Sequence, residues 1–364
     1  LDALLDSPAV AGVELERMGL PEVKAMAGGM LALNPLPAPF AGFLSERSNG
    51  NPFFIAEYLR SAVSERVLVR DRGGRWTFAA AGSLDATRYE SLPLPQSLRA
   101  LIELRLDRLE AAARRAVDCA ALVGRHVDTE LVQRVEGFGD DAMAAVIDEL
   151  VARQILEADE TEGFRFLHDK IREVVESRQS AGQRRALHHR IAEQLDAMHP
   201  DEEARAAAHG RHGHHWSGAG VPDKAAGHLR LAAERAQRLH AVDEAIELYG
   251  AALREIAAVR AGRPDRADHW RREALAVNEA LGELLSLKRH HEEARAALDA
   301  ALADSGGDGV TIARLHRRMG KTWEGEHRHD SALAAYAHAE TVLADGDESV
   351  DGWTNERILI KLSR

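Results

Sequence analysis

The sequence Phe-Arg-Phe-Leu-His-Asp at residues 164–169 separates two kinds of chain. Before it, short apolar runs alternate with helical segments and turns, whereas almost everything after it has helical periodicity. In this stretch the aromatic residues and the histidine alternate with arginine and leucine, and this period of two predicts a short strand. Asp169 is a residue type that caps helices, so we expect it to cap a helix over Lys170–Val175. The fold is therefore expected to change character at a strand that ends in His-Asp.

The composition favours helices that pack through small side chains. The chain has 364 residues, of which 45% are hydrophobic and only 5% aromatic, which is enough for roughly two or three domains. Its net charge of −12 argues against general affinity for nucleic acid or an anionic membrane. Cys119 is the single cysteine, so an internal disulfide is impossible. Because there is no signal peptide and no apolar run near about 20 residues, we expect a cytoplasmic location in a bacterial cell.

The first residues have a pattern that is typical of the end of a domain. The chain begins at Leu1 rather than Met and in mid-pattern, so we expect a fragment of a longer protein. Residues 10–15 predict a short final strand. A helix is expected from Leu20 toward Leu33, with Pro21 at a first-turn position where proline is tolerated.

A capped helix start is predicted in Ser-Asn-Gly-Asn-Pro-Phe-Phe-Ile-Ala-Glu-Tyr-Leu at residues 48–59. Asn51 is a good N-cap, and Pro52 fits the first helical position, where no amide donor is needed. Gly50 permits a tight backbone turn before the helix.

Between this helix and the strand at 164–169, the sequence predicts a hairpin followed by a winged helix. Residues 67–70 and 75–78 predict the two strands of the hairpin, joined by a Gly-Gly turn, and the two prolines within 92–95 predict a linker. A first helix is then expected from near Ser97, and a second over Ala111–Val123 with a stop at Gly124. A third, short helix is expected from a cap at Asp128 to Val135, and a fourth over Asp140–Gln154. Two strands are expected after them, at Ile155–Ala158 and Phe164–His168. Helices followed by two strands in this order are typical of a winged helix.

Many winged helices bind DNA, and this one is not expected to do so. The helix in the recognition position carries Asp140, Asp141, Asp148 and Glu149 against one arginine, Arg153. That face would repel phosphate. The charge of this helix therefore argues against a DNA reader.

The region after Asp169 contains a recurring triplet of a small residue, a large residue four positions later and a small residue three positions after that. The triplets are Ala225-Leu229-Ala232, Ala245-Tyr249-Ala252, Ala294-Leu298-Ala301 and Ala332-Tyr336-Ala339. They resemble the second helix of tetratricopeptide repeats, at irregular spacing. Such repeats bind proteins or peptides. The expected fold class is mainly α: a helical lid and winged-helix domain, then an α-solenoid of tetratricopeptide-like helix pairs.

Two motifs resemble those of the STAND proteins, signal-transduction ATPases with numerous domains (AAA+/NB-ARC-like). Gly-Asn-Pro at 50–52 resembles the family's Gly-x-Pro motif, whose proline packs on adenine. Leu-His-Asp at 167–169 resembles its Met-His-Asp signature, with Leu167 in place of Met. The resemblance implies that Gly50, Asn51, Pro52 and His168 bind nucleotide and that His168 senses the diphosphate of ADP through a charge-assisted hydrogen bond.

The resemblance also implies how the chain divides into domains and what each domain does. Residues 1–60 would be the C-terminal end of the NTPase core and lid, 61–95 the hairpin and linker, 96–180 the winged helix and 181–364 the repeats. The phosphate-binding loop, the acidic strand that holds Mg²⁺ and an effector domain would lie elsewhere in the parent protein. This fragment would then be no enzyme and would bind neither ATP nor ADP by itself. Exchange of ADP for ATP, with a signal on the repeats, would release the winged helix and permit oligomerisation.

Other candidate sites are judged structural. Gly-Lys-Thr at 320–322 lacks the earlier glycine and the strand of a phosphate-binding loop, so it is interpreted as a repeat helix terminus. The histidines at 209, 212, 214 and 215 have no cysteine or carboxylate at ligand spacing, and we expect them to be solvated or hydrogen-bonded without a metal. No catalytic arrangement can be recognised. Two alternatives stay open: a non-catalytic scaffold that binds a partner protein, and a DNA-binding regulator.

Overall fold

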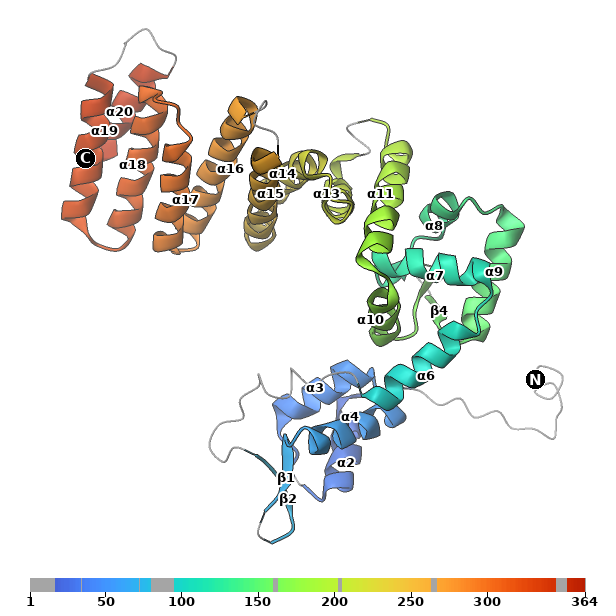
Figure 1. The fold of residues 1–364 in the computed structure, drawn as a ribbon. Helices are drawn as coiled ribbons and strands as arrows, with labels where there is room; N and C mark the ends of the chain where they lie inside the picture. Colours follow the sequence, from blue (N-terminus) through green and yellow to red (C-terminus); the bar gives the residue numbers. More distant parts are fainter. Residues whose placement is uncertain are drawn as a thin grey trace, which may run out of the picture. The chain divides into compact units, whose positions relative to one another are not determined.

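The computed structural model describes residues 17–33, 35–71, 73–79, 95–159, 163–201, 205–262, 267–344 and 352–363 (Figure 1). The chain is mainly α, as predicted, and it divides into two compact units, Leu1–Gln179 and Ser180–Arg364. The expected strand at 10–15, most of the loop and linker at 79–95 and the tip of the turn at 159–163 lie outside the described residues.

The described part of the first unit begins with three helices and a hairpin. These elements are α2 (Leu20–Leu31), α3 (Ala38–Ser48), α4 (Pro52–Ser64), β1 (Leu68–Arg70) and β2 (Trp76–Phe78). β1 and β2 pair antiparallel, so the predicted hairpin is confirmed. Phe40, Ile55 and Tyr58 lie in their shared core. We did not predict α3, because its start lies among the prolines at 35, 37 and 39. A proline in the first turn of a helix nevertheless costs no hydrogen bond, so the helix can begin there.

The rest of the first unit has the predicted order of helices and strands, with one addition. Its elements are α6 (Gln96–Asp107), α7 (Ala111–Val123), β3 (His126–Val127), α8 (Thr129–Glu136), α9 (Asp140–Ala152), β4 (Leu156–Asp159), β5 (Gly163–Phe166) and α10 (Asp169–Arg178). The three strands form an antiparallel sheet in the order β3-β5-β4. The sequence analysis missed β3, which has too few residues to show a period. It also ended α9 two residues late.

The second unit consists of helices in a consecutive stack. They are α11 (Ala181–Met198), α13 (His209–Gly218), α14 (Pro222–Arg238), α15 (Val242–Gly262), α16 (Ala267–Leu287), α17 (His291–Ala303), α18 (Gly309–Gly325), α19 (His329–Ala344) and α20 (Trp353–Ser363). All four predicted triplets are buried, and the expected α-solenoid of helix pairs is confirmed. Among the described helices, none combines the length and apolar character needed to span a membrane.

Neighbouring helices approach closely because a small residue faces the large residue of each triplet. A Cβ added to Gly213, Gly282 or Gly320 would lie 2.7, 2.9 or 2.3 Å from an atom of Leu229, Leu298 or Tyr336. Each glycine precedes its contact residue by sixteen positions. In α14 the corresponding small residue before Tyr249 is Ala233, which is fully buried. α14 therefore serves as the second helix for α13 and as the first helix for α15, which the triplet pattern alone did not reveal.

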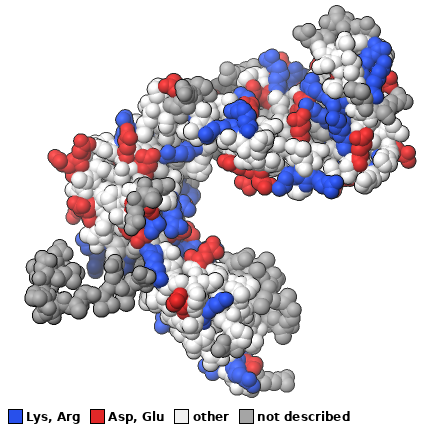
Figure 2. Space-filling model, turned by 180° about the vertical axis from the view of Figure 1, so that it is seen from behind, with Lys and Arg blue, Asp and Glu red and all other residues white. Residues whose placement is uncertain are grey.

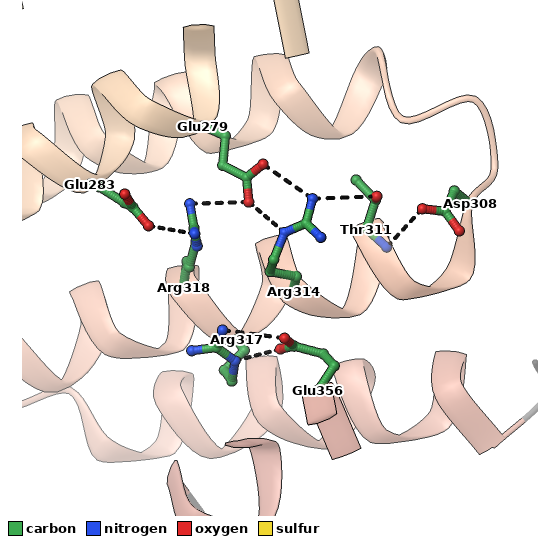
Figure 3. Close-up of polar contacts among 8 residues, drawn as sticks. All are labelled: Glu279, Glu283, Asp308, Thr311, Arg314, Arg317, Arg318 and Glu356. Atoms are coloured by element: carbon green, nitrogen blue, oxygen red, sulfur yellow. Dashed lines mark hydrogen bonds and ion pairs between the residues drawn. The ribbon is translucent and has the colours of Figure 1, made fainter. Parts of the chain in front are cut away.

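Arginine–glutamate pairs join the last helices of the stack (Figure 3). Arg314 of α18 donates from Nε to Glu279 Oε1 of α16 at 2.6 Å and from Nη2 to Glu279 Oε2 at 3.2 Å. Arg317, on another face of α18, forms a buried ion pair with Glu356 of α20. Because both partners are buried, either one alone would leave an uncompensated charge. These pairs fix which faces of α18 meet α16 and α20.

A substitution of Gly320 tests the close approach of α18 and α19. Gly320→Ala should lower the free energy of unfolding by about 1–3 kcal/mol, because the new methyl group collides with the ring of Tyr336. Gly227→Ala in α14 is the matched control, since its Cβ would meet no atom within 4 Å and alanine favours helix. Urea unfolding followed by circular dichroism measures both. Equal effects of the two substitutions would contradict this description of the packing.

Candidate functional site

The start of α4 has the predicted capped geometry. The Asn51 side chain accepts a hydrogen bond from the backbone amide of Phe53 at 3.0 Å, and Pro52 is the first helical residue. Gly50 has φ +70, and a Cβ there would lie 2.3 Å from the carbonyl oxygen of Met18. Only glycine fits this turn without moving residue 18. The turn thus holds Asn51 and Pro52 in fixed positions at the end of the helix.

His168 follows strand β5 directly. β5 lies between β3 and β4, and Leu167 extends the pairing by donating from its amide to the Ile155 carbonyl at 2.9 Å. The backbone of His168 is extended, with φ −147 and ψ 140, and occupies the cap position of α10. The prediction that Asp169 caps this helix is therefore wrong. Asp169 is instead the first helical residue. Its carboxylate lies 3.4 Å from Arg125 Nη1, and the positive N-terminal end of the helix dipole stabilises its negative charge.

The two predicted motifs meet at one cavity in the first unit. The rings of Phe54 and His168 are 4.6 Å apart, centre to centre. The cavity has a volume of about 710 Å³, and all four predicted nucleotide-binding residues line it. The lining residues are Arg17, Met18, Gly50, Asn51, Pro52, Phe54, Arg105, Val151, Gln154, Leu156, Glu157, Ala158, Leu167 and His168.

His168 presents an unused hydrogen-bonding atom in this cavity wall. The residue is only 7% exposed, and its Nδ1 is buried without a hydrogen-bond partner. Burial, and secondarily the charge of Arg17, lower its pKa from 6.5 to about 4. The imidazole is thus neutral at pH 7, so in a hydrogen bond from His168 to a phosphate the charge would come from the phosphate. A buried, unpaired nitrogen costs free energy that a ligand could recover.

Two arginines that the sequence analysis missed also line the cavity. Arg17 Nη2 lies 2.9 Å from Glu157 Oε2 and donates to the carbonyl of Leu167 at 3.4 Å. Arg105 Nη1 donates to the carbonyl of Gln154 at 3.2 Å. Neither arginine belongs to a recognisable motif, and tertiary structure alone brings them to Pro52 and His168. Glu157 is the one carboxylate among the lining residues.

The lining groups are suited to binding rather than to bond-breaking. Proline and phenylalanine offer apolar faces for a flat ring, and the arginines and His168 offer groups that interact with an anion. Among the described residues of the cavity wall there is no serine nucleophile and no carboxylate pair.

The remaining candidates lie in the second unit. Gly-Lys-Thr at 320–322 is inside α18 rather than at a helix terminus, and the Thr322 hydroxyl donates to the Met319 carbonyl at 2.7 Å. A phosphate-binding loop is therefore excluded there. His209, His212 and His215 are buried rather than solvated, and each lies within hydrogen-bonding distance of another side chain, which is the second of the two expected states. A second cavity, of about 340 Å³, is lined by residues of α16, α17 and α18, including the exposed Leu287 and the basic Arg318 and Lys321.

Comparisons with known proteins give no family. No protein-family model and no curated protein matches the chain. Among solved structures, BtubC (BKLC) from P. vanneervenii is 13% identical, with a TM-score of 0.32 over 67% of this chain and 98% of that one. A STAND protein with a tetratricopeptide repeat sensor from Pyrococcus horikoshii is also 13% identical, with a TM-score of 0.34 over 98% of this chain. The chain spans about half of the latter protein's length, 51%.

The lowered pKa of His168 predicts a pH dependence of stability. The unfolded chain binds a proton at His168 near pH 6.5, whereas the folded chain binds it only near pH 4. Acidification from pH 7 to pH 5 should therefore destabilise the fold by about 2 kcal/mol through this residue. His168→Gln should remove that part of the loss, as measured by urea unfolding at both pH values. His126→Gln, which replaces an exposed histidine of the neighbouring strand β3, is the control. An unchanged pH dependence in His168→Gln would contradict the assigned burial.

Proposed function

We propose that this chain is the regulatory and sensor portion of a STAND-type ATP-binding signalling protein. The observation that carries the proposal is the convergence of Pro52 and His168 on one cavity. These residues belong to motifs more than a hundred positions apart, and both motifs resemble nucleotide-binding motifs of one family. Nothing in ordinary helix capping requires the two motifs to share a cavity.

The cavity supports adenine nucleotide as the ligand. Its volume of about 710 Å³ is in the range of pockets that enclose small ligands. Pro52 and Phe54 would contact the base, and His168 would use its unpaired Nδ1 toward the diphosphate. Arg17 and Arg105 add positive charge at the same wall, which favours an anionic ligand. The hydrogen bond from His168 would come from a neutral imidazole.

In this proposal the nucleotide works as a switch between segments. Pro52 is fixed to α4, whereas His168 is fixed to β5 and α10. ADP, with its base on Pro52 and its diphosphate on His168, would stabilise the arrangement in which the two groups adjoin. Exchange for ATP, which differs at the phosphate end, would weaken the contact to His168 and shift the population toward a state that assembles. The winged-helix domain at 96–180 is the moving part in this scheme.

Catalysis is not assigned to this chain. The proposal places the phosphate-binding loop and the Mg²⁺ ligands in a separate core of the parent protein, and the effector domain also outside this chain. The chain alone would then neither hydrolyse ATP nor hold the nucleotide cofactor tightly. Its repeats would take a partner protein or peptide, for which the second cavity offers apolar Leu287 beside Arg318 and Lys321. The site of action would be the cytoplasm.

The charge of α9 speaks against the alternative of a DNA-binding regulator. Asp140, Asp141 and Asp148 are exposed on this helix, in the position where a DNA reader needs phosphate contacts. Figure 2 shows acidic and basic side chains interspersed over the visible face of the molecule. Among the described residues on that face, this mixture leaves no continuous basic track for a nucleic-acid backbone.

Nucleotide affinity of three variants tests the proposal, in a protein where this chain is joined to the proposed core. His168→Ala should weaken ADP binding by about tenfold or more, since a hydrogen bond to a charged group is lost, and should raise the output of the effector. Pro52→Ala should weaken ADP and ATP alike, because both carry the same base. Calorimetric titration measures each affinity.

Phe53→Ala is the control for these variants, because Phe53 lies in the same first turn of α4 but is 48% exposed and does not line the cavity. It should bind both nucleotides like the parent. If His168→Ala also binds ADP like the parent and leaves the effector quiet, His168 has no sensor role. The motif would then be a strand end that leads into a helix.

A further inference from the structure

Imidazole side chains gather where α11, α13 and α14 pack together at the start of the second unit. Their residues belong to segments that are separate in sequence, and Asp196 of α11 lies among them. This cluster plays no part in the nucleotide proposal, which concerns the first unit. The residues are His188, Asp196, His199, His209, His212, His214, His215 and His228.

His212 is the centre of one part of this cluster. Its side chain is completely buried, and both ring nitrogens have partners. Nδ1 lies 2.9 Å from Asp196 Oδ1, and Nε2 lies 3.2 Å from His199 Nδ1. The sequence analysis found no carboxylate near this histidine because Asp196 comes from the preceding described helix.

His228 completes the group from α14. Its ring stacks on that of His212 at 4.8 Å between centres, and its Nδ1 lies 3.0 Å from His209 Nδ1. One possible ligand atom from each of Asp196, His212 and His228 lies within 4.8 Å of the others. Donors on a tetrahedral Zn²⁺ are about 3.3 Å apart, so the group needs side-chain shifts of only about 1 Å.

We propose that Asp196, His212 and His228 form a binding site for a divalent transition-metal ion, with Zn²⁺ as the ion of choice. Two imidazoles and a carboxylate are ligands that Zn²⁺ takes, whereas Ca²⁺ and Mg²⁺ prefer oxygen ligands alone. His199 and His209 would hydrogen-bond the second ring nitrogens of the two ligand histidines. Such outer contacts orient a ligand ring toward its metal.

The charges around the trio are compatible with a cation. Asp196 supplies a negative charge at the site, and Lys224 Nζ lies 3.6 Å from its other oxygen, Oδ2.

A neighbouring trio of histidines is a poorer site and serves as a built-in comparison. His188, His214 and His215 also have atoms close together, but the trio includes no carboxylate. His214 is exposed, and the charges of Arg184 and Arg211 act on its partners His188 and His215. Both trios have basic neighbours, Lys224 and Arg205 in the first and these arginines in the second, but only the first trio has a carboxylate to offset them. We therefore assign the metal to the trio that contains Asp196.

A metal at this position would join three helices of the stack. Asp196 lies on α11, His212 on α13 and His228 on α14. An ion bound by all three would stabilise the start of the solenoid by mass action, because the unfolded chain does not hold the ligands together. The site would thus be structural, a metal staple for the first helices of the repeats.

Zn²⁺ titration of the full 364-residue chain tests the proposal. A sample without an affinity tag is stripped with a chelator and titrated with Zn²⁺ by calorimetry, and Co²⁺ absorption reports the coordination number. We expect one Zn²⁺ per chain, a four-coordinate Co²⁺ spectrum and a raised Tm. His228→Gln should weaken Zn²⁺ binding by about tenfold or more, whereas the matched His214→Gln should bind like the parent.

Asp196→Asn keeps the shape of the site and should also weaken binding, so it decides the matter if His228→Gln does not fold. Parent-like Zn²⁺ affinity in the folded ligand variants would overturn the proposal. A loss of binding in His214→Gln alone would move the site to the other trio and would equally overturn it. So would an absence of stoichiometric binding by the parent chain. None of these results bears on ADP binding by the first unit.

Discussion

The pairing of β5 with strands on both of its sides is the constraint on which the first unit depends. β5 is the central strand of its sheet, and Phe166 at its end is fully buried. Because side chains alternate along a strand, a slip of one residue would turn Phe166 out of the core. The same register places His168, two residues further on, against Phe54. The position of the candidate sensor thus follows from the burial of a neighbouring aromatic side chain.

The second unit obeys a different constraint, the close approach of helices through small residues. Each large residue follows the small residue that it faces by the same number of positions. The connections between successive helix pairs, in contrast, vary in length. Gly282 with Leu298 and Gly320 with Tyr336 show this contact in two successive helix pairs. A solenoid built in this way tolerates irregular spacing between repeats. It also leaves room for polar clusters between helices, such as the histidines around His212.

Local signals in the sequence predicted much of the fold. Asn51 caps α4 and Asp128 caps α8, and the chain turns at Gly124, because these roles depend on neighbours along the chain. The prediction that Asp169 caps α10 was wrong, because strand pairing up to Leu167 places His168 in the cap position. β3 is held in place only by its partner strand, and a two-residue strand has no detectable period.

The candidate sites were predictable only in part, for the same reason. Gly50, Asn51, Pro52 and His168 stood out because they lie in motifs, and the structure brings them to one cavity. Arg17 and Arg105 reach that cavity through tertiary packing, which no spacing in the sequence encodes. Asp196 likewise meets His212 only because α11 packs on α13. Charged residues that belong to no motif therefore reach both candidate sites through tertiary packing.

Hydrogen–deuterium exchange tests whether the segments around Pro52 and His168 form the proposed nucleotide site. The exchange of a protein that joins this chain to the proposed core would be compared with and without ADP. We expect ADP to slow exchange both in the first turns of α4 and at the junction of β5 with α10. Slower exchange at only one of these segments, or at neither, would contradict it.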